Sequence, residues 1–317
     1  MALANRLRKE PQSNALLRTT LRYPLLSQML PRGFSFLASF FLRVIALRVC
    51  DFIREVNVVS YYKGLSLDGK RALVFGGTAG IGNSIAVGLA EAGADVVPVS
   101  RRLAEVLKAA EEIRGLGRRT LELTADVARR ADIQRVVDRM VSEMGRIDIL
   151  VNSAGTTKRT PSLEMNDEDW NRIIEVNLNG TWNACQIVGR VMKEQLYGRI
   201  INIASLGAFV SVHEVAAYCC SKGAVAMLTR CLGAEWTKYN IAVNAIAPGY
   251  FETAMNRHII HEPGRKASIM SHSPMKRFGN LEEIKGAAIF LASDSASFVT
   301  GEILNVDGGF MAQGIGA

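Results

Sequence analysis

Tyr218 and Lys222 are the two residues whose types and spacing most clearly allow chemistry, because they stand four positions apart. That spacing places two side chains on the same face of a helix, one turn apart. An ammonium group beside a phenol favours the phenolate and lowers the phenol pKa from about 10 toward working pH. Such a phenol can exchange a proton with an alcohol or a ketone. The alternative is an ordinary helix with a half-buried tyrosine and a lysine that reaches to water.

Ser205 adds a hydroxyl thirteen positions before Tyr218. It follows the apolar run 200–204, which predicts a strand, whereas Tyr218 begins a segment with helical periodicity. The end of the strand and the first turn of the helix would then bring the two hydroxyls to one place. We interpret Ser205, Tyr218 and Lys222 together as a candidate acid–base site.

A glycine-rich loop stands between a predicted strand at 71–75 and a predicted helix at 80–92. Its spaced glycines are Gly76, Gly80 and Gly82. Strand, glycine turn and helix in this order form the context that a dinucleotide site requires. Glycines let backbone N–H groups approach a pyrophosphate, and the helix N-terminus favours its negative charge. Turns use glycine in any case, so the prediction depends on the flanking elements.

The glycine spacing and the candidate acid–base site together resemble the short-chain dehydrogenase/reductase family, whose glycine pattern is T-G-x-x-x-G-x-G. Phe75 stands where that family usually has Thr, which affects a local hydrogen bond rather than the phosphate cradle. The resemblance extends from about Leu67 to Phe310. Further matches occur in the same order along the chain: Asp126-Val127, Asn152-Ser153-Ala154-Gly155, Asn177, Pro248-Gly249 with Thr253, and residues 305–309.

The resemblance implies a role for each matching residue. Tyr218 would be the general acid/base, and Lys222 would lower its pKa and bind the nicotinamide ribose. Ser205 would donate to the substrate oxygen, and Asn177 would hold a water that links Lys222 to solvent. No metal is needed for this step. The implied cofactor-binding residues are Gly76, Thr78, Gly80, Ile81, Gly82, Ser100, Arg101, Arg102, Asp126, Val127, Asn152, Ala154, Gly155, Tyr218, Lys222, Pro248, Gly249 and Thr253.

Cofactor choice is read at Ser100, Arg101 and Arg102, which follow the second predicted strand. A carboxylate there would bind the ribose 2′-hydroxyl of NAD. Two guanidinium groups suit a 2′-phosphate instead, so we expect NADP(H), with NAD(H) as the alternative. Two observations favour the alternative. Both arginines can be solvated at a helix start, and Thr78 and Ala79 are neutral where many NADP-using relatives carry a basic residue.

Short apolar runs alternate with helical patterns from residue 71 onward, which indicates a parallel sheet covered on both faces. The fold class expected is α/β, a single doubly wound Rossmann-type domain at 67–317 with a seven-stranded parallel sheet. The strands are expected at 71–75, 95–99, 119–123, 147–151, 198–203, 241–246 and 302–306. The helices are expected at about 80–92, 102–116, 131–144, 167–193, 217–239 and 281–292.

Most of the positive charge lies at the start of the chain. The first seventy residues hold eleven Lys or Arg and four Asp or Glu, a net of +7, which leaves +1 of the total +8 for residues 71–317. A nucleic-acid-binding domain carries a basic face, so we expect no nucleic-acid partner. The five cysteines lack the spacing of a metal site and indicate a reducing compartment, for which cytoplasmic localisation is expected.

Residues 1–66 precede the family resemblance and form a basic N-terminal extension, expected to be partly helical or disordered. Its apolar run from Phe34 to Leu42 is nine residues long, too short to span a bilayer. Three interpretations stay open: a basic amphipathic segment on a membrane surface, an organelle transit sequence, or a tail without fixed structure.

The substrate class rests on resemblance alone. The stretches 155–177 and 306–312 are similar to those of gluconate 5-dehydrogenases and related sugar-acid dehydrogenases. Lys158 and Arg159 follow the fourth predicted strand, where an arginine would pair with a sugar carboxylate or else remain a solvated charge. A 3-oxoacyl-carrier-protein reductase has the same motifs, although the near-neutral domain disfavours an acidic carrier protein. A catalytically silent nucleotide-binding regulator is the other alternative, against which the intact catalytic set argues.

Two further expectations follow from the resemblance. Relatives pair through the helices at 167–193 and 217–239, so a homodimer or homotetramer is expected. The segment from Tyr250 to Pro274 is expected to form a lid over the substrate.

Overall fold

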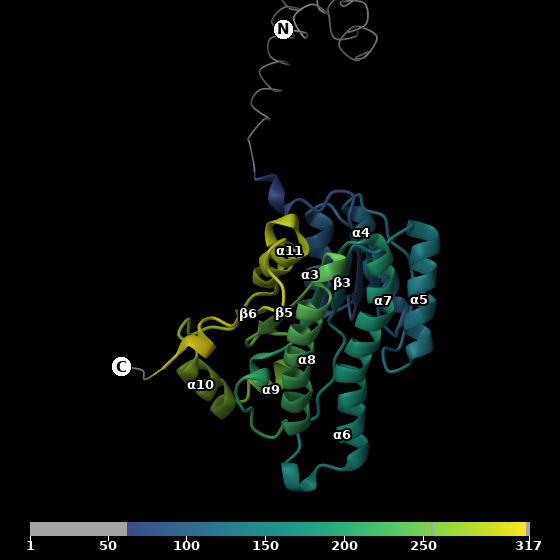
Figure 1. Cartoon of the computed structure of the whole chain (residues 1–317). Coiled ribbons are helices and arrows are strands. Elements are labelled where there is room, and N and C mark those ends of the chain that lie inside the picture. Colours follow the sequence, from purple (N-terminus) through teal and green to yellow (C-terminus); the bar gives the residue numbers. More distant parts are fainter. Residues whose placement is uncertain (1–61, 255, 315–317) are drawn as a thin grey trace, which may run out of the picture. The chain divides into compact units, whose positions relative to one another are not determined.

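Six parallel strands form the sheet against which the helices of the described residues pack (Figure 1). The computed structural model describes residues 62–254 and 256–314, with residues 258 and 259 as backbone only. Within this part the chain from Lys63 onward clusters as one compact unit. The interpretations offered for residues 1–66 fall almost entirely outside the described residues, and the domain boundary at residue 67 stays a prediction.

The strands run in the order β2-β1-β3-β4-β5-β6, and every neighbouring pair is parallel. Their bounds are β1 (Arg71–Phe75), β2 (Asp95–Val99), β3 (Ile149–Asn152), β4 (Gly198–Ile203), β5 (Ile241–Pro248) and β6 (Ile303–Val306). Because all the strands are parallel, their carboxyl ends lie at one edge, and the order reverses between β1 and β3. That edge is where open α/β sheets bind ligands.

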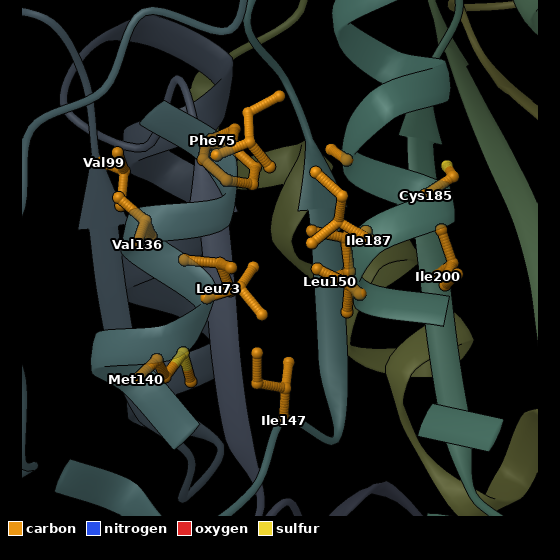
Figure 2. Packing of buried hydrophobic residues seen from close by; sticks show 14 of the residues in the cluster. Leu73, Phe75, Val99, Val136, Met140, Ile147, Leu150, Cys185, Ile187 and Ile200 are labelled. Carbon is orange, nitrogen blue, oxygen red and sulfur yellow. The ribbon is translucent and has the colours of Figure 1, made fainter. Parts of the chain in front are cut away.

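Alternate side chains of the strands face opposite layers of helices. Leu73 and Phe75 of β1 point into the core under α5 and α7 (Figure 2). Ala72 and Val74 belong to the second core cluster, under α3 and α11. The helices are α3 (Gly80–Glu91), α4 (Leu103–Gly115), α5 (Arg130–Met144), α6 (Asp167–Ile174), α7 (Gly180–Gln195), α8 (Ala216–Glu235), α9 (Arg257–Ile260), α10 (Pro263–His272) and α11 (Lys285–Ala292). The doubly wound α/β fold is therefore confirmed.

The seventh strand, expected at 119–123, does not form. The segment lies beside β2, where Val96 donates its N–H to the carbonyl of Arg119 at 3.1 Å, and the two chains next meet in an isolated bridge between Ser100 and Thr124. Between these points β2 holds Pro98, which has no N–H to continue the ladder. The prediction of seven strands was wrong because it gave that proline no weight.

The helix expected at 167–193 is continuous but contains a wider turn. Residues Glu175–Asn179 form a π-helical turn between α6 and α7, and the buried Asn177 lies within it. Such turns often occur at functional sites. The other expected helices lie within a few residues of their expected bounds, with short 3₁₀ turns at Leu281–Ile284 and Thr237–Tyr239 where longer helices were expected. The helices α9 and α10 were not expected from the sequence.

No helix within the described residues is both long and apolar enough to cross a membrane.

Candidate active site

Ser205 and Tyr218 meet at the carboxyl edge of the sheet because a strand end and a helix start meet there. Ser205 lies two residues beyond β4, in extended backbone, and its hydroxyl accepts the N–H of Gly207 at 3.1 Å. Tyr218 lies in the first turn of α8, where its phenol is close enough to the Ser205 side chain for Ser205 to act on its pKa. The structure therefore brings together the two hydroxyls that the sequence placed thirteen residues apart.

The electrostatics of Tyr218 differ from the sequence expectation. Burial raises its pKa above the ordinary value of 10.0, and the Ser205 side chain opposes that rise. Lys222 is 5% exposed, donates to the carbonyl of Ile203 at 2.6 Å, and holds its ammonium 5.8 Å from the centre of the Tyr218 ring. Burial lowers the pKa of Lys222 to about 8. The expected lowering of the Tyr218 pKa is thus outweighed here, because both groups are desolvated and the ammonium is bonded to backbone.

Asn177 is fully buried, and its side-chain amide is used inside the protein. It accepts the N–H of Thr156 at 2.8 Å and donates to the Thr156 carbonyl and to Ser221, each at 3.0 Å. The amide thereby ties the π-helical turn to the loop after β3 and to the helix that carries Tyr218. Because both amide N–H groups are already bonded, a water held by this residue would have to donate to one of its oxygens.

The glycine loop is shaped for close backbone approach. Gly76 has φ +76°, and a Cβ atom there would lie 2.6 Å from the backbone nitrogen of Ala154. Gly80 has φ +52°, and a Cβ there would lie 3.2 Å from the Thr253 side chain. Ala79 caps α3 without a side-chain oxygen, so the first N–H groups of that helix have no capping partner. The loop is therefore a cradle that a side chain would fill.

The end of β2 offers the groups expected to contact the adenosine ribose. The Ser100 hydroxyl oxygen is buried and has no hydrogen-bond partner among the described residues. Arg101 is exposed beside it, and Arg102 is also exposed and pairs with Glu105 at 2.8 Å. A buried hydroxyl without a partner beside two exposed guanidinium groups fits a bound polar group at this position.

Three other predicted cofactor residues use their side chains within the protein. Asp126 accepts the N–H of Ala128 at 3.1 Å, which closes a turn, and Val127 packs against Gly180. Asn152 is 4% exposed and donates to Asn202 at 2.9 Å and to Cys185. The Asn152 side chain thus belongs to a buried polar network, and a contact from this residue to a cofactor would have to come from its backbone.

The remaining predicted positions line the same edge of the sheet. A Cβ at Gly155 would lie 3.5 Å from Asn177 and 3.8 Å from Lys222, so this glycine adjoins the acid–base site. Gly249 follows the end of β5 at Pro248, and Thr253 is held by two contacts to Asn256, at 2.8 and 3.1 Å. Thr78, Ile81 and Gly82 lie in the glycine loop or the first turn of α3.

Four residues at or near the acid–base site were given no catalytic or binding role from the sequence, although two of them, Tyr250 and Arg265, lie in the segment expected to form a lid. Cys219 and Tyr250 are close enough to Tyr218 to influence its pKa, and Arg265 influences that of Tyr250. Phe310 packs its ring 5.7 Å from that of Tyr250. Cys219 follows Tyr218 in the sequence, but Tyr250, Arg265 and Phe310 come from three distant segments, and only the fold shows that they meet.

A cavity of about 280 Å³ lies beside this site, at the carboxyl ends of β5 and β6, and shares Tyr250 with it. Its other lining residues are Phe251, Ser273, Met275, Arg277, Gly279, Glu283, Asn305, Val306, Asp307, Gly308 and Gly309.

The two basic residues expected near a substrate carboxylate already have partners in the chain. Lys158 pairs with Asp169 of α6. Arg159 pairs with Glu214 and Glu262. In this structure neither is the free carboxylate receptor that the sequence suggested.

Comparison with known proteins agrees with this geometry. The family model described as Enoyl-(Acyl carrier protein) reductase matches residues 76–311. The 2-dehydro-3-deoxy-D-gluconate 5-dehydrogenase of Pseudoalteromonas atlantica is 42% identical, over 78% of this chain and 98% of that protein. The chain belongs to the short-chain dehydrogenase/reductase family. Membership makes it an NAD(P)-dependent oxidoreductase that acts on CH–OH groups.

Other members of this family are similar over the same part of the chain. Gluconate 5-dehydrogenase of Gluconobacter oxydans is 37% identical, over 77% of this chain and 95% of that protein. The crystal structure of a gluconate 5-dehydrogenase from Burkholderia cenocepacia in complex with NADP and tartrate is 39% identical. It superposes with a TM-score of 0.77, covering 80% of this chain and 99% of that one.

Proposed function

We propose that this short-chain dehydrogenase/reductase uses NADP(H) to interconvert a secondary alcohol and a ketone on a sugar acid. The observation that carries the proposal is the meeting of Ser205, Tyr218 and Lys222 at the sheet edge, beside the glycine cradle. The relatives named above, which are sugar-acid dehydrogenases, and the structure titled as a complex with NADP support the substrate class and the cofactor.

The residues present fit a dinucleotide phosphate. The uncapped N–H groups at the start of α3 and the cradle at Gly80 would hold the pyrophosphate. Ser100, with its hydroxyl lacking a partner, and the guanidinium groups of Arg101 and Arg102 would hold the 2′-phosphate. When bound, the nicotinamide supplies hydride transfer, and the protein supplies position and protonation.

Tyr218 is the proposed general acid/base. Its pKa is raised, so at neutral pH it is protonated and can give its proton to the oxygen of a ketone. In the reverse direction it takes the proton from the alcohol. Ser205 donates a second hydrogen bond to the same oxygen and stabilises the charge that develops there. The Lys222 ammonium, 5.8 Å from the Tyr218 ring, stabilises the phenolate that remains.

Arg265 is our candidate for the cation that recognises a sugar carboxylate. It is half-buried on α10, its charge reaches Tyr250, and it forms no ion pair among the described residues. Unlike Arg159, it therefore has a guanidinium to offer a substrate.

We further propose that the protein is a homodimer or homotetramer and acts in the cytoplasm. Partly exposed apolar side chains on three neighbouring helices support the first proposal: Trp170 on α6, Trp182 on α7 and Met227 on α8. An organelle or a membrane surface, reached through residues 1–66, remains the alternative location.

The test is the absorbance of the reduced nicotinamide with purified protein. It would be followed with NADP and then NAD against sugar acids, neutral sugars and secondary alcohols, and in reverse with oxoacyl thioesters. Turnover of a sugar acid with NADP is expected. Turnover confined to oxoacyl thioesters would favour a carrier-protein reductase, and tight cofactor binding without turnover would favour a silent regulator.

A further inference from the structure

Arg159 is the point at which three distant segments of the chain meet. Its Nε donates to Glu214 at 2.5 Å, and its Nη1 donates to the two oxygens of Glu262 at 3.1 and 3.4 Å. Arg159 lies in the loop after β3, Glu214 lies in the loop before α8, and Glu262 is the residue that precedes α10. One guanidinium thus holds two carboxylates, and the pKa of Arg159 is raised mainly by its bond to Glu214.

Arg159 and Glu214 lie in two loops that are joined by more than this ion pair. The N–H of Thr160 donates to the Glu214 carbonyl at 2.8 Å, so backbone and side chain both join the two loops. Glu214 has φ +61°, a left-handed conformation that a non-glycine residue keeps only where its surroundings enforce it. It stands four residues before Tyr218. Glu214 therefore fixes the position of Arg159 relative to the first turn of α8.

Glu262 joins Arg159 to the start of α10. Pro263 begins α10, and the Glu262 carbonyl accepts the N–H of Lys266 at 2.8 Å in its first turn. Glu262 is the N-cap of α10, with φ −56° and ψ 127°, and Arg265 follows it in the first turn of the helix. Its charge acts on Tyr250, which in turn acts on Tyr218. The first turn of α10, which Glu262 precedes, thus carries a charge that acts on the active site.

We propose that Arg159 is a positioning residue that holds the start of α10 against the active site, with Glu262 as its partner on α10 and Glu214 as its fixed support. The structural part of this inference is independent of the proposed function, whereas its kinetic part rests on it. The pair to Glu262 is half exposed, with 36% and 50% of the two side chains accessible. Pairs of this kind contribute little individually, so breaking it should change an equilibrium by about two- to five-fold.

The test uses four full-length variants: Glu262→Gln, Arg159→Gln, the two combined, and Lys266→Gln as control. Lys266 is an exposed residue of the same helix, and its substitution also removes one charge. Thermolysin cleavage within residues 250–274 measures release of α10 without any turnover. Cleavage should be about two- to five-fold faster in Glu262→Gln and at least as fast in Arg159→Gln. The combined variant should match Arg159→Gln, and the control should match the wild type.

Two results would overturn the proposal. One is cleavage of Glu262→Gln at the wild-type rate. The other is a combined variant that is cleaved faster than Arg159→Gln by the same factor by which Glu262→Gln is cleaved faster than the wild type. Unfolding temperatures of all four variants identify any that fail to fold.

The kinetic readout separates this role from substrate binding by Arg159. Because α10 also carries Arg265, positioning predicts that Glu262→Gln raises KM for a sugar acid, and raises it more than KM for the neutral sugar. If Arg159 instead binds the substrate carboxylate, Glu262→Gln would lower KM for the acid alone, which would contradict the proposal. Failure of the proposed function would remove this readout but leave the proteolysis result intact.

Discussion

Burial of Lys222 has a consequence for stability that can be measured apart from activity. Its pKa falls from an ordinary value of 10.5 to about 8 in the folded protein. The unfolded chain therefore binds more protons than the folded chain between these two values, and stability must rise with pH across that window. One pKa unit corresponds to about 1.4 kcal/mol, so the full effect is about 3 kcal/mol, of which about 2 kcal/mol falls between pH 7 and pH 9.5.

The perturbation is Lys222→Met, which removes the titrating group and keeps an unbranched chain of similar length. Urea unfolding of wild type and variant at pH 7 and pH 9.5 gives four free energies of unfolding. The variant also loses the hydrogen bond to the Ile203 carbonyl, which lowers its free energy of unfolding at both pH values. This loss therefore cancels when the two pH values are compared. We expect the free energy of the wild type, relative to the variant, to rise by about 2 kcal/mol between the two pH values.

An exposed lysine of α4 provides the control. Lys108→Met removes one charge from the surface and should show no such change with pH. If the difference in free energy of unfolding between wild type and Lys222→Met is the same at pH 7 and pH 9.5, the prediction is wrong. Lys222 would then titrate alike in the folded and unfolded chain.

Three further changes test the cofactor site and the core beneath it. Replacing Arg101 and Arg102 by Ser should raise KM for NADP by roughly ten-fold or more and leave KM for NAD nearly unchanged. The reason is that charge-assisted hydrogen bonds to a phosphate contribute about 1.5–3 kcal/mol. Equal KM values for NADP in variant and wild type would contradict this prediction. Gly80→Ala should weaken NADP binding in a fluorescence titration, since φ at Gly80 is +52° and the new Cβ enters the cradle. The control variant Gly286→Ala adds its Cβ in open space and should bind NADP as the wild type does. Equal NADP binding by the two variants would argue against the cradle. Asn152→Ala should lower the free energy of unfolding by about 1–3 kcal/mol, because it leaves the buried amide oxygen of Asn202 with only the weak thiol donor of Cys185. A wild-type urea midpoint would show that the network is not stabilising.

Much of the site could be predicted because local patterns determine it. Gly76, with φ +76°, is determined by the strand and helix directly beside it. Tyr218 and Lys222 are likewise placed together by a spacing of one helical turn. The strand failed at 119–123 because a single proline in the neighbouring strand interrupts the ladder, and this effect depends on which strands become neighbours.

Side-chain direction was the part that sequence could not supply. Asn152 matched a family motif, yet its amide turns into the core toward Asn202. Two alternatives were open for Arg159, a substrate carboxylate or solvent, yet it is held by two carboxylates 55 and 103 positions away in the chain. The rise in the Tyr218 pKa is similar in origin, because desolvation depends on the packing of the whole site.

The central claim is that Tyr218 exchanges the proton with the substrate oxygen. The most direct test compares wild type with Tyr218→Phe for NADP binding by fluorescence and for turnover of a sugar acid by nicotinamide absorbance. The account predicts that the variant binds NADP as the wild type does and loses nearly all of its turnover. Turnover at the wild-type rate in Tyr218→Phe would contradict it.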